Sequence, residues 1–183
     1  MKTLLKISLL SLAVLFATSS FTFAQKRGNG KNRPSPNAEV SQTIGTTAVS
    51  VTFGRPGLKG RTLESLTPKG KVWRTGANES TAITFSGDVT VGDKDIKAGT
   101  YSLYTIPQGD KWTIIINSKL SWGTQYDKAM DVARIKVSPE DGDHSVEWFA
   151  IYFDDLSNTS ANMILRWGDA VVCTCTVSGS QDP

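Results

Sequence analysis

Short apolar runs alternate with polar residues along most of the chain, a pattern that predicts β-strands with one buried face and one solvated face. Clusters of Gly, Pro, Asp and Asn separate the runs and predict tight turns. The expected strands are residues 49–53, 82–85, 89–91, 101–106, 112–116, 133–137, 146–153, 161–167 and 171–177. About nine short strands at this spacing predict an all-β fold, a single-domain antiparallel β-sandwich for which a jelly roll is one option.

Two properties of the pattern refine this expectation. Residues 112–116 are almost entirely apolar, so this strand is expected to be central and covered on both faces. Residues 62–66 suit a single helical turn, and residues 120–130 place Trp122, Tyr126 and Met130 four apart, which predicts a short amphipathic helix. The order of the strands in the sheets does not follow from the pattern.

The first 24 residues have the three parts of an export signal. Lys2 and Lys6 form a positive start, residues 9–16 are the centre of an apolar run, and Ala24 offers a small residue at the cut. The apolar run is shorter than the roughly 20 residues that span a bilayer. We therefore expect cleavage after Ala24, a periplasmic or extracellular location, and no integral membrane segment after processing.

Composition divides the remaining chain into three parts. Residues 25–38 are expected to form a flexible basic arm, because residues 25–37 hold four basic residues and no acidic, aliphatic or aromatic residue. Residues 39–178 are expected to form the β-sandwich domain, and residues 179–183 a C-terminal tail.

Charge and residue counts exclude several classes of function. Without the signal the chain keeps 18 basic and 17 acidic residues, a balance that argues against a nucleic-acid binder. One histidine and two cysteines are too few for a Cys/His metal cage or a disulfide framework, so we predict no metal and no cofactor. Cys173 and Cys175 lie two apart on the last predicted strand, and their redox state stays open, as does the oligomeric state.

Positive charge is concentrated between residues 55 and 74, where six basic residues accompany only Glu64. Such a patch would attract a small anionic ligand, for which the planar fork of arginine is well suited. The alternative is that these residues pair with the acidic side chains that predominate in the rest of the chain.

The most distinctive motifs of the chain lie in the same region. They are Arg55-Pro56, Lys59-Gly60-Arg61 and the run from Pro68 to Asn78, followed by Ala98-Gly99-Thr100-Tyr101-Ser102-Leu103, Ile106-Pro107 and Trp112-Thr113. Over residues 39–178 the chain resembles the secreted bacterial domain-of-unknown-function family 2911. The resemblance implies an envelope or secreted location and a β-rich fold, and it implies no established activity.

The strongest candidate for a site is the loop that contains Trp73, Arg74, Asn78 and Glu79. Gly76 permits a tight backbone and Asn78 can cap a turn, so Arg74 and Glu79 could project as a polar cluster beside an aromatic ring. Further ligand-binding candidates are Arg55, Arg61 and Tyr104. The alternative is a buried pair between Arg74 and Glu79 that braces the loop.

Three aromatic residues outside this loop, Tyr104, Trp122 and Tyr126, could expose rings that stack on sugars, or could simply pack on the sheet. The leading hypothesis is a non-catalytic ligand-binding module, with a glycan or small anionic ligand as partner. Two alternatives remain open: a hydrolase that holds an anionic group with Arg74 and uses Glu79 as acid or base, and a purely structural envelope protein without a small ligand.

Overall fold

The alternating sequence pattern produces two antiparallel sheets in a computed structural model, which describes residues 32–179. In this part of the chain the first sheet has six strands in the order β1-β2-β3-β6-β7-β8, and the second has four in the order β5-β4-β10-β9. The six strands are β1 (Asn37–Ile44), β2 (Thr47–Gly54), β3 (Thr81–Phe85), β6 (Gly99–Pro107), β7 (Trp112–Asn117) and β8 (Asp131–Val137). The four are β4 (Val89–Val91), β5 (Lys94–Ile96), β9 (Glu140–Asp154) and β10 (Ser160–Gly179).

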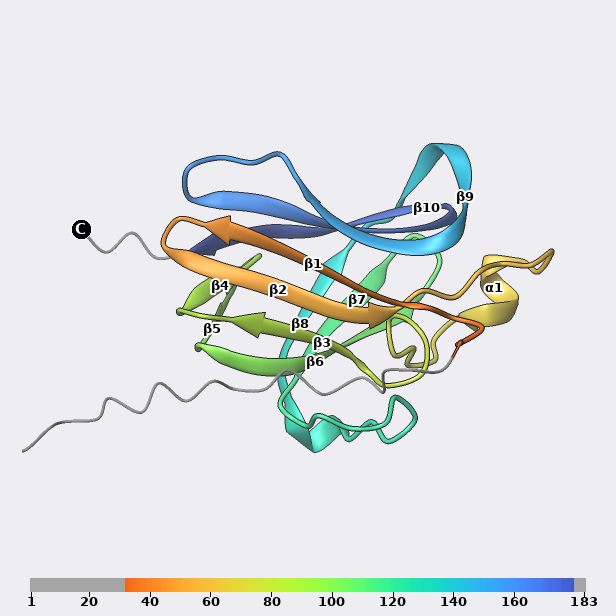
Figure 1. The fold of residues 1–183 in the computed structure, drawn as a ribbon, viewed down its shortest axis with the longest axis horizontal. Coiled ribbons are helices and arrows are strands. Elements are labelled where there is room, and N and C mark those ends of the chain that lie inside the picture. Colours follow the sequence, from red (N-terminus) through yellow and green to blue (C-terminus); the bar gives the residue numbers. More distant parts are fainter. Residues whose placement is uncertain (1–31, 180–183) are drawn as a thin grey trace, which may run out of the picture.

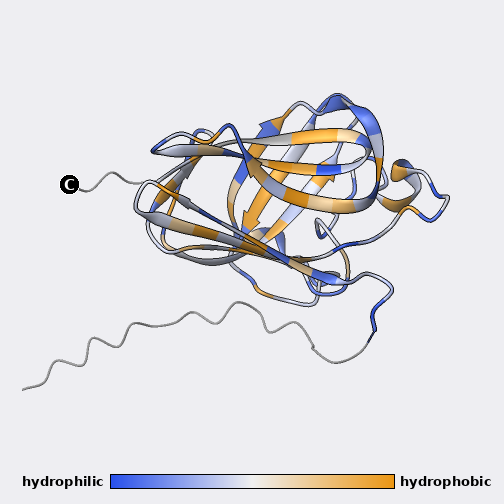
Figure 2. Cartoon of the chain, turned by 45° about the horizontal axis from the view of Figure 1, so that its top comes forward, coloured by the Kyte–Doolittle hydropathy of each residue, from blue (hydrophilic) through white to orange (hydrophobic). Residues whose placement is uncertain are grey.

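The two sheets lie face to face, and the apolar positions of their strands meet between them (Figures 1 and 2). Each strand contributes alternate residues to this core, because successive side chains point to opposite faces of a sheet. Large apolar side chains from both layers contribute to this core: Phe53, Phe85, Ile114, Ile116, Phe149, Met163, Leu165 and Trp167. The prediction of an all-β sandwich is confirmed.

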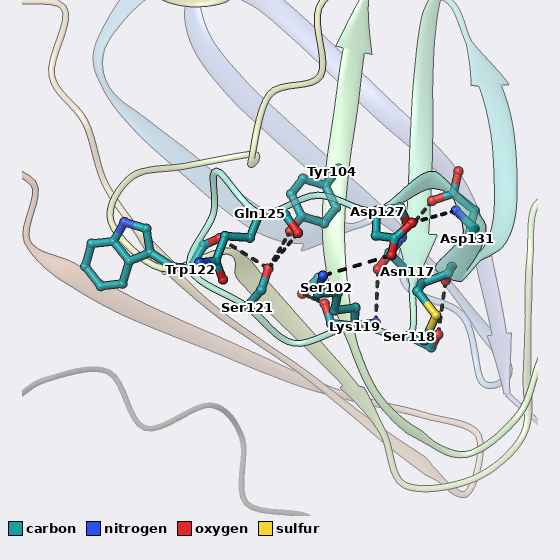
Figure 3. Close-up of polar contacts among 12 residues, drawn as sticks. Ser102, Tyr104, Asn117, Ser118, Lys119, Ser121, Trp122, Gln125, Asp127 and Asp131 are labelled. Atoms are coloured by element: carbon teal, nitrogen blue, oxygen red, sulfur yellow. Dashed lines mark hydrogen bonds and ion pairs between the residues drawn. The ribbon is translucent and has the colours of Figure 1, made fainter.

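Strand β7 is buried along its whole length, as its apolar sequence predicts. Its inner residues Ile114 and Ile116 belong to the main core, whereas Ile115 lies on the outer face of the six-stranded sheet. The segment between β7 and β8 covers this outer face, so both sides of the strand are shielded from water (Figure 3).

Two strands occur where the sequence pattern predicted none. Strand β1 is mostly polar, but it pairs with β2 over eight consecutive positions and packs Ala38 and Val40 against the core. Strand β5 lies where a turn was expected, and its Ile96 is buried. The two strands predicted for residues 161–167 and 171–177 form the single strand β10. Its pairing with β9 continues past Gly168 through two register shifts.

Helical structure is scarce in the described residues. Helix α1 (Leu63–Leu66) confirms the predicted turn, and the side chain of Thr62 caps its start by accepting from the Ser65 backbone N–H. The predicted amphipathic helix over residues 120–130 is wrong: only η1 (Lys128–Met130) is helical, as a 3₁₀ turn. Instead of continuing a helix, the backbone of this segment forms a β-bridge between Trp122 and Glu79.

The predicted signal peptide, residues 25–31 of the predicted arm and residues 180–183 of the predicted tail lie outside the described residues. The side chains of Cys173 and Cys175 also lie outside them. Within the part of the chain that is described, the structure has no helix with the length and apolar character needed to cross a membrane.

Candidate functional site

The ring of Trp73 lies in the core between the two sheets. Its backbone forms a two-way bridge with Thr105 of β6, at 2.8 and 2.9 Å, which turns the side chain inward. The indole stacks on Trp167 with 5.5 Å between ring centroids and meets the edge of Phe149 at 5.0 Å. Trp73 therefore joins the aromatic core at one end of the sandwich.

Arg74 points the other way, because residues of an extended segment alternate between faces. Its side chain packs closely on Gly123, where an added Cβ would lie 2.3 Å from the Arg74 Cδ. The guanidinium Nη1 donates to the carbonyl of Asn78 at 3.1 Å. Arg74 is thus half-buried and ties its own loop to the segment that follows β7.

Backbone geometry explains the small residues of this loop. Gly76 adopts φ +148°, and a Cβ there would lie 2.9 Å from both the Gly54 carbonyl oxygen and the Thr81 hydroxyl. Asn78 adopts the left-handed φ of 67°, which asparagine tolerates better than most residues. Its Nδ2 donates to the carbonyl of Ser35 at 3.1 Å.

Glu79 is 6% exposed, and its carboxylate accepts two hydrogen bonds from Arg33, at 2.7 and 3.1 Å. The side-chain hydrogen bond to Glu79 raises the pKa of the Arg33 guanidinium further above its ordinary value. Arg33 comes from the predicted basic arm, 46 residues away along the chain. A partly buried, bidentate pair of this kind fixes the direction of both groups.

Arg55 completes the attachment of the N-terminal segment, because its backbone N–H donates to the Pro36 carbonyl at 2.8 Å. We call these three contacts the N-terminal clasp; they join Arg33 to Glu79, Ser35 to Asn78 and Pro36 to Arg55. The motif residues Arg55, Asn78 and Glu79 thus hold the chain just before β1.

The arginines of the basic segment bind backbone carbonyls. Arg55 donates from Nε to the carbonyl of Phe149 at 2.8 Å. Arg61 donates to the carbonyls of Leu58 and Gly57, at 2.9 and 3.0 Å, and so shapes its own loop. Their guanidinium groups brace the loop that leads to α1.

Tyr104 is completely buried, on the outer face of the six-stranded sheet (Figure 3). Its hydroxyl lies 3.3 Å from the Ser121 hydroxyl, and its ring contacts the edge of Tyr126 at 5.0 Å between centroids. Of the two alternatives that the sequence left open for Tyr104, the structure shows the packed one, because the segment after β7 covers the ring. For Trp122 the structure shows the other alternative, because its ring points away from this network and the residue is 50% exposed.

Asn117 holds the segment between β7 and β8, residues 118–130, in place. Its Nδ2 donates to the Asp127 carbonyl and to the Asp131 carboxylate, both at 2.8 Å, and its Oδ1 accepts from the Lys119 backbone N–H. Burial of the ring and its hydrogen bond to Asp131 raise the pKa of the Tyr126 hydroxyl. This polar network is satisfied internally and stiffens the outer face.

A concave surface lies beside α1, the helix that Figure 1 shows at one end of the sandwich. Two adjoining hollows there have volumes of about 250 and 470 Å³, and the larger one lies within the range of ligand pockets. We call them together the α1 groove. Its lining comes from α1, the β6–β7 turn, the start of β9 and the middle of β10: Leu58, Arg61, Thr62, Leu63, Glu64, Thr67, Lys69, Pro107, Gly109, Trp112, Pro139, Glu140, Asp141, Ser145, Gly168, Asp169 and Ala170.

Irregular pairing between β9 and β10 creates one wall of the α1 groove. The register shifts on both sides of Gly168, which has a positive φ of 59°. Bulges of this kind re-aim side chains at the end of a sheet. Leu58 and Leu63 pack over Gly168, at 3.9 and 3.8 Å from the position that its Cβ would take.

The α1 groove combines an apolar floor with a charged rim. A small inner cavity, lined by Trp73 and Trp167 among others, shares Leu63, Trp112 and Ala170 with the hollow above it. Exposed charged side chains surround this floor: Arg61, Glu64, Lys69, Glu140, Asp141 and Asp169. Among the described side chains, which do not include those of residues 173–176, no three His, Cys, Asp or Glu are grouped so that they could hold a metal ion.

The structure therefore separates the residues that the sequence put forward. Arg61 lies on the rim of the α1 groove, and Trp73 lies beneath its floor. Arg55, Asn78 and Glu79 hold the N-terminal clasp, while Arg74 and Tyr104 face the segment after β7. Sequence reasoning missed the acidic rim, because its members come from three separate parts of the chain.

These features define a two-sheet β-sandwich with an aromatic core at one end and an open groove above it. The chain belongs to the family described as protein of unknown function (DUF2911), whose model matches residues 35–174. Comparisons with curated proteins and with solved structures found no match.

Proposed function

We propose that this protein is an exported, non-catalytic module that binds a glycan in the α1 groove. The observation that carries the proposal is the groove itself, in which an apolar floor around Leu63 and Trp112 is surrounded by exposed polar groups. Carbohydrate ligands need both, because their C–H faces pack on apolar surface while their hydroxyls seek hydrogen-bond partners. Export rests on the signal pattern of the first 24 residues.

The geometry of Glu79 argues against hydrolysis at the loop that contains Trp73, Arg74, Asn78 and Glu79. A catalytic acid or base must reach the substrate, but Glu79 is only 6% exposed and its carboxylate is held by both terminal nitrogens of the Arg33 guanidinium. A hydrolase that used Arg74 and Glu79 would first have to open the N-terminal clasp. An open clasp is therefore a requirement of the hydrolase alternative.

The test is glycan binding by the mature chain, first on an array of bacterial and plant oligosaccharides and then by calorimetry on those retained. Ala170→Trp is the blocking variant, because Ala170 lines both hollows of the groove and the inner cavity. Ala129→Trp is the matched control, since Ala129 is exposed on η1.

We expect Ala170→Trp to weaken binding by at least about tenfold, or about 1.4 kcal/mol, and Ala129→Trp to leave it unchanged. Thermal unfolding of both variants checks that the fold is kept. Equal binding by the two variants would place the ligand elsewhere. If the array retains no glycan, the proposal fails and the purely structural alternative is favoured.

A further inference from the structure

The rim of the α1 groove carries an excess of negative charge that has no partner among the described residues. Four carboxylates line the groove: Glu64, Glu140, Asp141 and Asp169. Within residues 32–179 none of these four side chains takes part in a hydrogen bond or ion pair. Several carboxylates elsewhere are engaged, as Asp88 is with Lys97 and Asp131 is with Arg134.

The two cationic side chains on the rim do not neutralise this charge by direct pairing. The guanidinium of Arg61 donates to the carbonyls of Leu58 and Gly57, which directs it into its own loop. The ammonium of Lys69 lies over Gly109, 3.5 Å from the position that a Cβ would take. The formal balance of the rim is therefore two negative charges, which favours a positively charged ligand over an anionic one.

We infer that the glycan bound in the α1 groove is an amino sugar with a free amine. This inference rests on the proposed function, and the charge of the rim selects among glycans. The apolar floor at Leu63 and Trp112 accepts the C–H face of a sugar ring, and the ammonium group meets the carboxylates of the rim. An ammonium over an indole gains further attraction from the face of the ring.

Binding is compared for glucosamine oligomers and for their N-acetylated counterparts, at slightly acidic pH where the free amine is charged. Acetylation removes the positive charge and keeps the sugar ring, so the pair isolates the charge. We expect the unacetylated oligomers to bind at least about tenfold more tightly, which corresponds to about 1.4 kcal/mol. The advantage should shrink as the salt concentration rises, because the rim is exposed and screened.

A double variant, Glu64→Gln with Asp141→Asn, tests the source of the preference. It should remove most of the difference between the two oligomers. Glu39→Gln is the matched control, because Glu39 is exposed on β1 and lies outside the groove. We expect it to keep the full preference.

The outcomes separate the inference from the proposed function. Equal affinity for both oligomers overturns the inference and leaves glycan binding intact. Binding of lysine oligomers without binding of amino sugars also overturns it, since the occupant would then be a basic peptide. If the chain binds no glycan of any kind, the proposed function fails and the inference fails with it.

Discussion

Arg33 and Glu79 form a bidentate ion pair that joins the segment before β1 to the loop between Trp73 and β3. The carboxylate is almost fully buried and the guanidinium is 21% exposed, so the pair is partly shielded from water. Two backbone contacts, from Asn78 to Ser35 and from Arg55 to Pro36, run beside it. The most distinctive sequence motif of the chain therefore serves to hold the N-terminal segment against the sandwich.

The first prediction concerns this pair. Glu79→Gln should lower the midpoint of thermal unfolding, because the guanidinium of Arg33 then loses its charged partner. Arg33→Gln should lower it as well, and the double variant should lose less than the two single changes together. Hydrogen exchange should report faster exchange at the Arg55 amide, which donates to the Pro36 carbonyl, in each single variant. Strictly additive effects in the double-mutant cycle would show that the two residues act independently.

The second prediction concerns the contact between Arg74 and Gly123. Gly123→Ala should destabilise the fold by about 1–3 kcal/mol, because the new methyl group would collide with the Arg74 side chain. Its Cβ would lie 2.9 Å from the Arg74 Cβ as well as 2.3 Å from Cδ, so rotation of the arginine tip alone gives no relief. Chemical denaturation measures the loss. Adding Arg74→Ala should recover part of it, and no recovery would assign the cost to the backbone.

The third prediction concerns the stacked tryptophans. Trp73→Ala should cost about 3–5 kcal/mol, the usual loss for removing a large aromatic side chain from a core. It should also change the near-ultraviolet circular dichroism, since Trp73 stacks on Trp167 with only 19° between ring planes. Trp122→Ala is the control and should cost less than about 1 kcal/mol, because Trp122 is half exposed. Similar losses in both variants would contradict the packing described for Trp73.

The fourth prediction concerns Asn117. Asn117→Ala should cost about 1–3 kcal/mol, because the buried amide serves both the Asp127 carbonyl and the Asp131 carboxylate. Residues 118–130 should then exchange amide hydrogens faster than β3 or β6. Ser118→Ala is a milder comparison, since its exposed hydroxyl only supplements a backbone bond to Met130. Unchanged exchange in residues 118–130 would show that Asn117 does not hold the segment.

The fifth prediction concerns the stability of the fold at low pH. The hydrogen bond from Arg166 holds the pKa of the Asp143 carboxyl below its ordinary value, and Lys97 does the same for Asp88. A lowered folded-state pKa means that the unfolded chain takes up the proton first. Both residues therefore stabilise the fold above about pH 4 and lose that contribution as the pH falls through their folded-state values.

Urea midpoints measured between about pH 6 and pH 2 test this expectation. The double variant Asp88→Asn with Asp143→Asn should show a shallower fall in stability than the original chain. Glu39→Gln, an exposed change outside any ion pair of the described residues, should leave the slope as it is. An unchanged slope in the double variant would assign acid sensitivity to other carboxylates.

Local sequence was sufficient for most strands, because a strand with one buried face must alternate its side chains. The clearest case is β7, whose apolar run predicted burial on both faces. The pattern failed for β1, where polar residues pair with β2 at an edge of the sheet and only every second side chain approaches the core. It also failed over residues 120–130, where spacing suited a helix but the backbone bridges to Glu79.

The candidate site could be predicted only in part. The sequence marked Arg61 and Trp73, and the structure places them on the rim and beneath the floor of the α1 groove. It gave no sign that Glu64, Asp141 and Asp169 would surround the same hollow. No local rule links these three positions, because they meet only when β9 and β10 pair and α1 folds over the bulge at Gly168.

By itself, the sequence determined the all-β class, the helical turn at α1 and the family resemblance, since each depends on the pattern of neighbouring residues. The tertiary structure alone decided which residues share a surface. It placed Glu79 against Arg33 across 46 positions, turned Trp73 into the core, and gathered unpaired carboxylates at one end of the sandwich. These relationships depend on sheet order and register, which arise from the packing of the whole domain and leave no local periodicity to read.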